Sequence, residues 1–352
     1  MTQNAALPLL FTPMSLRSVS LPNRIVVPPM AQYTADDGVA NDFHQVHYGK
    51  FALGGAGTVF VEATGVTREG RITNGCLGLW NDTQQRAFEP ITRLIRSRGA
   101  VPAIQIGHGG RKSSMQRPWF GNGPLNAQDF ARGEQSWQPL APSAVALADG
   151  WLVPKEMDEH DMARTRQAFV DAALRALAAG FEIVEIHMAH GYLLHSFLSP
   201  LSNFRTDAYG GSLAARMRYP LEVASAVRVA LPAGTPLFVR ISSEDGFEGG
   251  WTMDDSVVLA RELLACGVDV IDCSSGGNTP RGATNANLQR APGQPVGLIR
   301  YSGPPVAHPA WPGTQDRLSW LVQLVAILAA ADAPPQALSL FVTDARGHAG
   351  LW

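Results

Sequence analysis

Short apolar segments rich in β-branched residues recur along the chain. Each is followed by polar or glycine-rich residues, and then by a segment whose apolar positions have helical spacing. Several of these runs are continuously apolar, which is typical of strands covered on both faces of a parallel sheet. We therefore predict strands at residues 24–27, 58–63, 101–106, 183–187, 237–241 and 268–272.

Two amphipathic helices are predicted between these strands. The stretch 161–179 has helical spacing; Asp158 or Asp161 can cap its start, and Gly180 lies where a C-terminal cap belongs. The stretch 252–266 is similar and is followed by Gly267. Alternating strands and helices indicate an α/β fold.

Two α/β architectures compete, an open doubly wound sheet and a closed barrel. The segment NRIVVPPMAQY around the first predicted strand lacks G-x-G-x-x-G, which removes the main argument for the doubly wound form. Polar groups instead follow all six strands, in the segments PPMAQY, ATG, QIGHGGRK, HMAHGY, RISSED and CSSGG. Barrel enzymes carry their functional groups at this edge, so we predict a (β/α)8 TIM barrel.

Composition narrows the function classes. A net charge of −2 gives no strong field to attract nucleic acid or an anionic membrane. The longest apolar stretch, 318–331, is shorter than the about 20 residues that a membrane span needs, and we interpret it as a buried helix. Three scattered cysteines do not suit a disulfide framework, and no signal peptide is recognisable, so we expect a cytoplasmic protein.

His187 and His190 lie at the end of the fourth predicted strand, with Tyr192 close behind. At a strand-to-loop turn the two imidazoles can converge and hold a carbonyl or oxyanion, while Tyr192 can give a proton. Two other interpretations stay open: satisfied structural histidines, or a metal site with His108 as the third ligand. Because no glutamate lies between the pair as in H-E-x-x-H, we expect no metal.

Two further polar residues belong to strand ends. Gln105 lies at the end of the third strand, and Arg240 closes the fifth. An arginine at the end of an apolar strand needs a negative partner, either Glu185 or Asp272 in a salt bridge or an electron-rich atom of a ligand. The double proline at 28–29 forms a stiff turn that exposes backbone groups or simply ends its strand.

The segments NRIVVPPMAQY, VFVEATGV, IQIGHGGRK, EIHMAHGYLLHSFLSPLSNFRTDAYGGSLAARMR and LFVRIS occur in the order and spacing of the old yellow enzyme family. The chain resembles most its bacterial branch of ene reductases and xenobiotic reductases, over residues 9–292. This resemblance implies one barrel domain over residues 1–352, with FMN at the mouth formed by the strand ends.

The resemblance also implies roles for individual residues. Four residues after the first strand would line the flavin: Pro28, Pro29, Met30 and Ala31. Ala63 would pack near the flavin, Gln105 would form a hydrogen bond with its pyrimidine edge, and Arg240 would lie beside its N1/C2 carbonyl side. On the substrate side, His187 and His190 would hold the carbonyl, Tyr192 would give a proton, and Tyr33 would line the pocket. NADPH or NADH would supply hydride, through flavin N5, to the C=C bond of an α,β-unsaturated carbonyl or nitro compound. Relatives often form dimers or tetramers, so the resemblance also implies a homo-oligomer.

The chain departs from the family in two places. Many relatives have cysteine or threonine where this chain has Ala31, so we predict a changed flavin potential. After residue 292 the family's two final strands, which hold the FMN phosphate, are not recognisable, although 296–299 (VGLI) is a candidate seventh strand.

Composition changes in the same C-terminal segment. Residues 293–352 contain no lysine and no glutamate but seven prolines and three of the eight tryptophans, which suggests translation out of the ancestral frame. The last one or two βα units are therefore expected to be atypical or missing. Two alternatives to a working ene reductase follow: an inactive, flavin-deficient relative, and a metal-dependent barrel lyase or hydrolase that uses His187 and His190.

Overall fold

The computed structural model describes residues 8–280, 321–326, 338–343 and 349–350. A nine-stranded sheet is its central feature, in the order β13-β12-β11-β10-β9-β8-β5-β4-β3. The six strands from β10 to β3 are all parallel. They are β3 (Val26–Val27), β4 (Thr58–Gly65), β5 (Val101–Gly107), β8 (Ile183–Met188), β9 (Leu237–Ser242) and β10 (Val270–Ser274).

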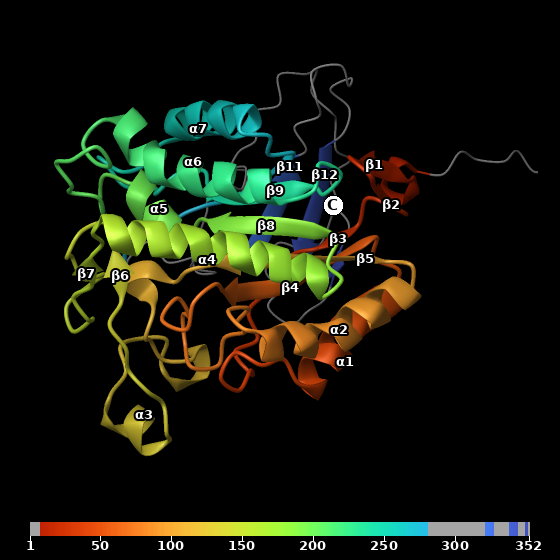
Figure 1. The fold of residues 1–352 in the computed structure, drawn as a ribbon, viewed down its shortest axis with the longest axis horizontal. Coiled ribbons are helices and arrows are strands. Elements are labelled where there is room, and N and C mark those ends of the chain that lie inside the picture. Colours follow the sequence, from red (N-terminus) through yellow and green to blue (C-terminus); the bar gives the residue numbers. More distant parts are fainter. Residues whose placement is uncertain (1–7, 281–320, 327–337, 344–348, 351–352) are drawn as a thin grey trace, which may run out of the picture.

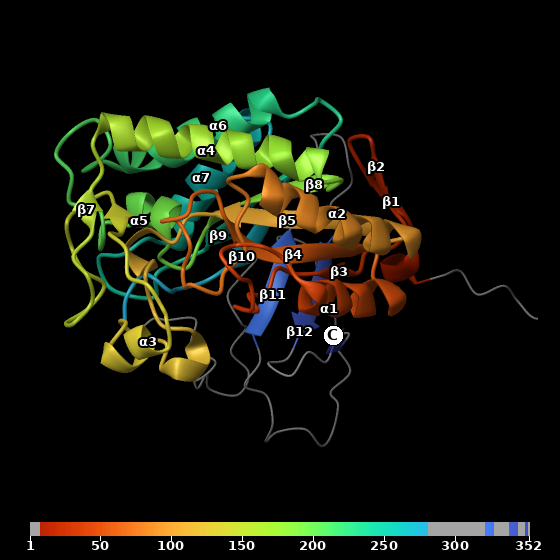
Figure 2. The same ribbon diagram turned by 60° about the horizontal axis from the view of Figure 1, so that its bottom comes forward.

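All six strands predicted from the sequence are confirmed, although the first is shorter than expected. Five long helices pack side by side over the sheet and form an outer layer in the order of their strands (Figures 1 and 2). They are α1 (Asp42–Leu53), α2 (Asp82–Ser97), α4 (Glu159–Ala178), α6 (Leu213–Ala230) and α7 (Met253–Ala265). The two predicted helices correspond to α4 and α7.

Local sequence fixes the ends of α4. Asp158 is its N-cap and forms a capping box with Asp161, in which each side chain accepts from the other residue's backbone N–H. At the other end Gly180 has φ +94°, a left-handed conformation that glycine adopts without a steric penalty. The pattern therefore gave both the helix and its boundaries.

The two faces of the sheet have different partners. The outer face packs on the helices through residues such as Val184, Ile186 and Val239. The inner face is apolar at the start of each strand, where the hairpin of β1 (Met14–Leu16) and β2 (Val19–Leu21) covers it. Two and four residues further along the strands the inner positions become polar, so the chemistry is confined to the carboxyl-terminal half.

Several shorter elements lie outside these two layers. The element α5 (Leu193–Leu198) directly follows the turn after β8. The segment with α3 (Ala127–Ala131) lies apart from the helix layer in both views (Figures 1 and 2). The remaining short elements are η1 (Leu9–Phe11), η2 (Gly110–Lys112), η3 (Pro118–Phe120), β6 (Leu140–Ala141) and β7 (Lys155–Glu156).

The C-terminal strands differ from the barrel pattern. β11 (Leu321–Ala326) pairs antiparallel with β10, and β12 (Leu338–Thr343) and β13 (Ala349–Gly350) continue the sheet in antiparallel fashion. The predicted helix at 318–331 is therefore wrong over residues 321–326. A short apolar run is compatible with either a strand or a helix. Here the residues form a strand because they pair with the free edge of β10. The expected fold, a (β/α)8-type barrel with atypical last units, is confirmed.

The candidate seventh strand at 296–299 and the family boundary at residue 292 lie outside the described residues. Most of the segment 293–352, for which we suggest a change of reading frame, lies outside them as well. Within the described residues, no helix is long and apolar enough to cross a bilayer.

Candidate active site

Parallel pairing brings the predicted site residues together at one edge of the sheet. His187 of β8 lies opposite Arg240 of β9, which lies opposite Asp272 of β10. One step towards the base of the sheet, Gln105 of β5 lies opposite Glu185 of β8. Residues separated by up to 167 positions in the chain thus share two adjacent levels of the inner face.

The two histidines belong to a series of hydrogen bonds in which donor and acceptor can be assigned at each ring nitrogen. The backbone N–H of Ala189 donates to Nδ1 of His187 (3.1 Å), so the hydrogen of this ring is on Nε2. Nε2 of His187 lies 3.3 Å from Nδ1 of His190, and Nε2 of His190 lies 2.6 Å from Oγ of Ser274. Both rings therefore carry their N–H on Nε2: His187 donates to His190, and His190 donates to Ser274.

Both histidines are neutral near pH 7. Burial, followed by the charge of Arg240, holds the pKa of each ring well below its usual range. Tyr192 packs edge-on against His187, with ring centroids 4.9 Å apart, and burial raises the pKa of its hydroxyl. The cluster thus offers neutral N–H and O–H donors, a set suited to an oxygen that gains negative charge.

Arg240 is almost completely buried, at 1% exposure. Its Nε lies 3.4 Å from Oδ2 of Asp272, so one of the two salt bridges anticipated from the sequence is present. Even so, Nε and Nη2 have no hydrogen-bond partner among the described residues. Burying a guanidinium with unsatisfied donors is costly, which points to an acceptor that belongs in this place.

Two carboxyl groups neighbour this arginine. Glu185 accepts from Nε2 of Gln105 (2.8 Å), and burial, with the nearby charge of Asp272, raises its pKa to about 8. Burial also raises the pKa of Asp272, while Arg240 opposes the shift. Near pH 7 Glu185 is therefore largely protonated, and Asp272 is the carboxyl group that lies against the guanidinium of Arg240.

The segment after β3 is hydrogen-bonded to the buried carboxyl group of Glu62, which the sequence did not single out as a candidate. Glu62, fully buried, accepts from the backbone N–H of Gln32 (2.6 Å) and from the hydroxyl of Tyr48 (2.8 Å). Burial raises its pKa to about 7. Its side chain reaches this position because the β4–β5 register shifts between Val61 and Thr64, and such a bulge re-aims the residues within it.

The remaining predicted residues lie along the same rim. Pro28 and Pro29 are buried. Partial exposure is found for Met30, Ala31, Tyr33 and Ala63. A hollow opens between the ends of β4, β5 and β8, and its lining includes Ala63, Cys76, His108, His187 and Tyr192. Nε2 of His108 has no hydrogen-bond partner within the described part of the chain.

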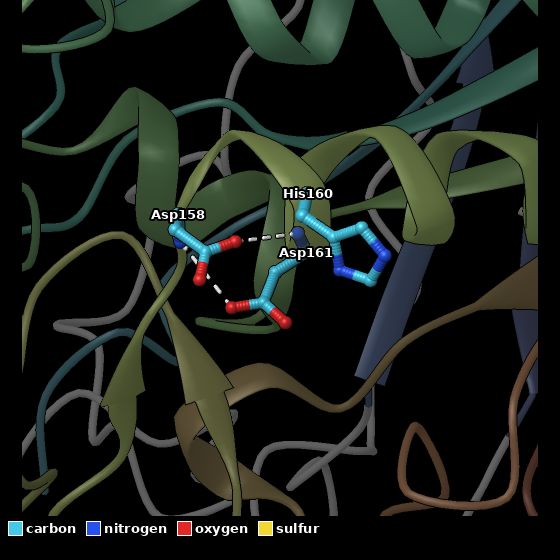
Figure 3. Close-up of side chains that lie close together, drawn as sticks. All are labelled: Asp158, His160 and Asp161. Atoms are coloured by element: carbon cyan, nitrogen blue, oxygen red, sulfur yellow. Dashed lines mark hydrogen bonds between the residues drawn. The ribbon is translucent and has the colours of Figure 1, made fainter.

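The structure also bears on the metal alternative. Among the described residues, the one group of three potential ligands within 4.8 Å of each other is Asp158, His160 and Asp161, not the histidines at the strand ends. Figure 3 shows the two hydrogen bonds of the α4 capping box within this group. Nζ of Lys155 also lies 3.2 Å and 2.6 Å from the two aspartates. Capping and an ion pair therefore account for this group.

A model of the NADH:flavin oxidoreductase / NADH oxidase family matches residues 9–289, and the chain belongs to this family. An NADH:flavin oxidoreductase from Gibberella zeae is 41% identical over 80% of this chain and 70% of its own. An NADPH dehydrogenase from Bacillus cytotoxicus is 40% identical over 83% and 77%. The solved old yellow enzyme homologue from Zymomonas mobilis is 26% identical, with a TM-score of 0.65 over 76% of this chain and 74% of that chain.

These comparisons confirm the resemblance to old yellow enzymes and the expected class, an oxidoreductase that uses FMN and a nicotinamide nucleotide. The residues present fit the ring system of FMN. The unsatisfied donors of Arg240 and the amide of Gln105 suit the acceptors of its pyrimidine edge. Ala63 presents a small side chain to the hollow that His187 and Tyr192 also line. Most of the segment 293–352, where the family has its phosphate-binding strands, lies outside the described residues.

Proposed function

We propose that the protein is an ene reductase, which uses NADPH or NADH to reduce the C=C bond of α,β-unsaturated carbonyl or nitro compounds. The observation that carries this proposal is the pair of neutral imidazoles of His187 and His190, which share one tautomer beside the Tyr192 hydroxyl. When bound, FMN supplies the hydride.

The histidines would bind the substrate oxygen. A carbonyl oxygen would replace Ser274 as the acceptor of the His190 N–H, and it would replace Nδ1 of His190 as the acceptor of the His187 N–H. Negative charge that develops on this oxygen would be stabilised by two fixed donors in a site with little water. Because both rings are neutral, they would give hydrogen bonds without giving up a proton.

Tyr192 would supply the proton to the α-carbon. Its raised pKa keeps the hydroxyl protonated at neutral pH, so the proton is available when the carbon becomes basic. Arg240 and Gln105 would hold FMN through its pyrimidine edge, and Pro28, Pro29, Met30, Ala31 and Ala63 would line the ring. Tyr33, whose backbone has φ +54°, would line the substrate pocket.

The purified protein tests this proposal directly. We expect flavin absorption bands and NADPH-dependent reduction of cyclohexenone. Tyr192→Phe should slow this reduction about 10²- to 10⁴-fold and leave NADPH oxidation by oxygen unchanged. Tyr209→Phe is a matched control, since the Tyr209 hydroxyl is bonded to Glu222 on the surface of α6.

Three outcomes would contradict the proposal. A colourless protein without flavin would favour the flavin-deficient relative. A yellow protein that reduces no enone or nitroalkene would exclude this substrate class. Activity that chelators abolish and added metal restores would favour the metal-dependent lyase or hydrolase.

A further inference from the structure

The backbone of the turn that contains His190 packs directly against the backbone of the loop after β10. His190 has φ +61° and Gly191 has φ +71°, a left-handed pair. A Cβ atom on Gly191 would lie 2.3 Å from the carbonyl oxygen of Gly277, and one on Gly277 would lie 2.5 Å from Cα of His190. The position of His190 thus depends on how this loop is held.

The side chain of Lys112 joins the two segments. Its Nζ donates to the carbonyl oxygen of His190 (2.8 Å) and to that of Gly277 (3.0 Å). The same ammonium lies 5.0 Å from the centroid of the Tyr192 ring. Lys112 of η2 therefore contacts both His190, which would bind the substrate oxygen, and Tyr192, which would protonate the substrate.

Neighbouring contacts reinforce this arrangement. The backbone N–H of His190 donates to Oγ of Ser242 (2.9 Å), which in turn donates to the carbonyl oxygen of Gly276 (2.8 Å). Nη2 of Arg111 donates to the carbonyl oxygen of Asn278 (2.5 Å). With its N–H and its C=O both bonded, the His190 backbone has little freedom to rotate away from the site.

We propose that Lys112 is a positioning residue of the carbonyl-binding site, which fixes His190 through its backbone oxygen and places a positive charge on the face of Tyr192. This inference rests on the proposed function. Burial, together with the charge of Arg111, lowers the pKa of Lys112 to about 8, so most of the ammonium keeps its charge at pH 7.

Lys112→Met keeps the length of the side chain and removes the donors and the charge. In the FMN-loaded enzyme we expect kcat/KM for cyclohexenone to fall about 10- to 100-fold, since a displacement of about 1 Å at a reacting group has effects of this size. Lys50→Met is the matched control: Nζ of Lys50 lies 4.8 Å from the Phe51 ring centroid on α1, away from the strand ends. It should retain wild-type kcat/KM.

A second measurement separates positioning from a general effect on folding. Imidazole ¹⁵N shifts of the FMN-loaded wild type should show protonated Nε2 and unprotonated Nδ1 in His187 and His190. In Lys112→Met the His190 signals should move towards a mixture of tautomers, while those of His160 on α4 stay fixed. A loss of thermal stability alone would not produce this pattern.

The outcomes are distinct. If Lys112→Met retains kcat/KM within about twofold and leaves the His190 shifts unchanged, Lys112 has no positioning role. If the wild type reduces no enone, the proposed function fails, and the ¹⁵N comparison alone still decides whether Lys112 fixes His190. If Lys112→Met does not fold, Lys112→Gln, which keeps an N–H donor without the charge, is read by the same two measurements.

Discussion

Glu185 provides a quantitative test of the electrostatics beneath the site. The replacement Glu185→Gln has almost the same shape as the protonated acid and keeps an oxygen that can accept from Gln105. This substitution removes a buried titration while leaving the hydrogen bond to Gln105 in place. Its effect on stability should therefore depend strongly on pH.

The magnitude follows from the raised pKa of Glu185, about 8 against 4.5 for an ordinary glutamate. Between these values the folded protein keeps a proton that the unfolded chain releases, so the stability of the wild type falls as pH rises. One proton corresponds to about 1.4 kcal/mol per pH unit, or about 4 kcal/mol between pH 5 and pH 8. Because Asp272 lies in the same environment, this proton belongs to the pair of carboxyls.

Urea unfolding of the FMN-free proteins at pH 5, 6, 7 and 8 measures the difference. Glu185→Gln should be close to the wild type at pH 5, and should gain relative to it by several kcal/mol on the way to pH 8. Glu89→Gln, the same change at an exposed position of α2, controls for net charge. Parallel pH profiles for the wild type and Glu185→Gln would refute the reasoning, because no proton would then be taken up on folding.

Three further changes probe other parts of the structure. Ala31→Cys adds a polarisable thiol where we propose that residue 31 lines the flavin, and it should shift the midpoint potential of the flavin; equal potentials in both proteins would contradict the prediction. Gly107→Ala places a methyl group 3.1 Å from Cβ of His187, so kcat/KM for cyclohexenone should fall about 2- to 10-fold, and unchanged kinetics would show that the ring gives way freely. Asp158→Ala removes the N-cap of α4 and should cost about 1 kcal/mol in urea unfolding; stabilisation of the wild type alone by added Zn²⁺ would mean that this cap binds metal.

Local features were predicted well because their causes are local. Six apolar runs became six parallel strands, and Asp158 and Gly180 marked the ends of α4 as expected. The apolar stretch at 318–331 was misread because an apolar run of this length carries no information about its neighbour. The antiparallel edge at β10, which makes residues 321–326 a strand, is a tertiary contact.

For the site, the sequence named the residues but not their state. It placed His187, His190 and Tyr192 at one strand end, and it left the partner of Arg240 open among Glu185, Asp272 and an electron-rich atom of a ligand. The structure pairs Arg240 with Asp272 and gives Glu185 to Gln105. Ser274 and Lys112 were not singled out, although both belong to segments, CSSGG and HGGRK, that follow predicted strands.

The sequence by itself determined the six parallel strands, the helices α4 and α7, the family and the identity of the polar residues at the strand ends, because these follow from periodicity and from short motifs. Only the tertiary structure decided how those residues act on each other. A tautomer, a shifted pKa and an unsatisfied guanidinium depend on distances between β5, β8, β9 and β10, which are far apart in sequence and meet through parallel pairing. The proposed carbonyl-binding site is thus a property of the sheet register.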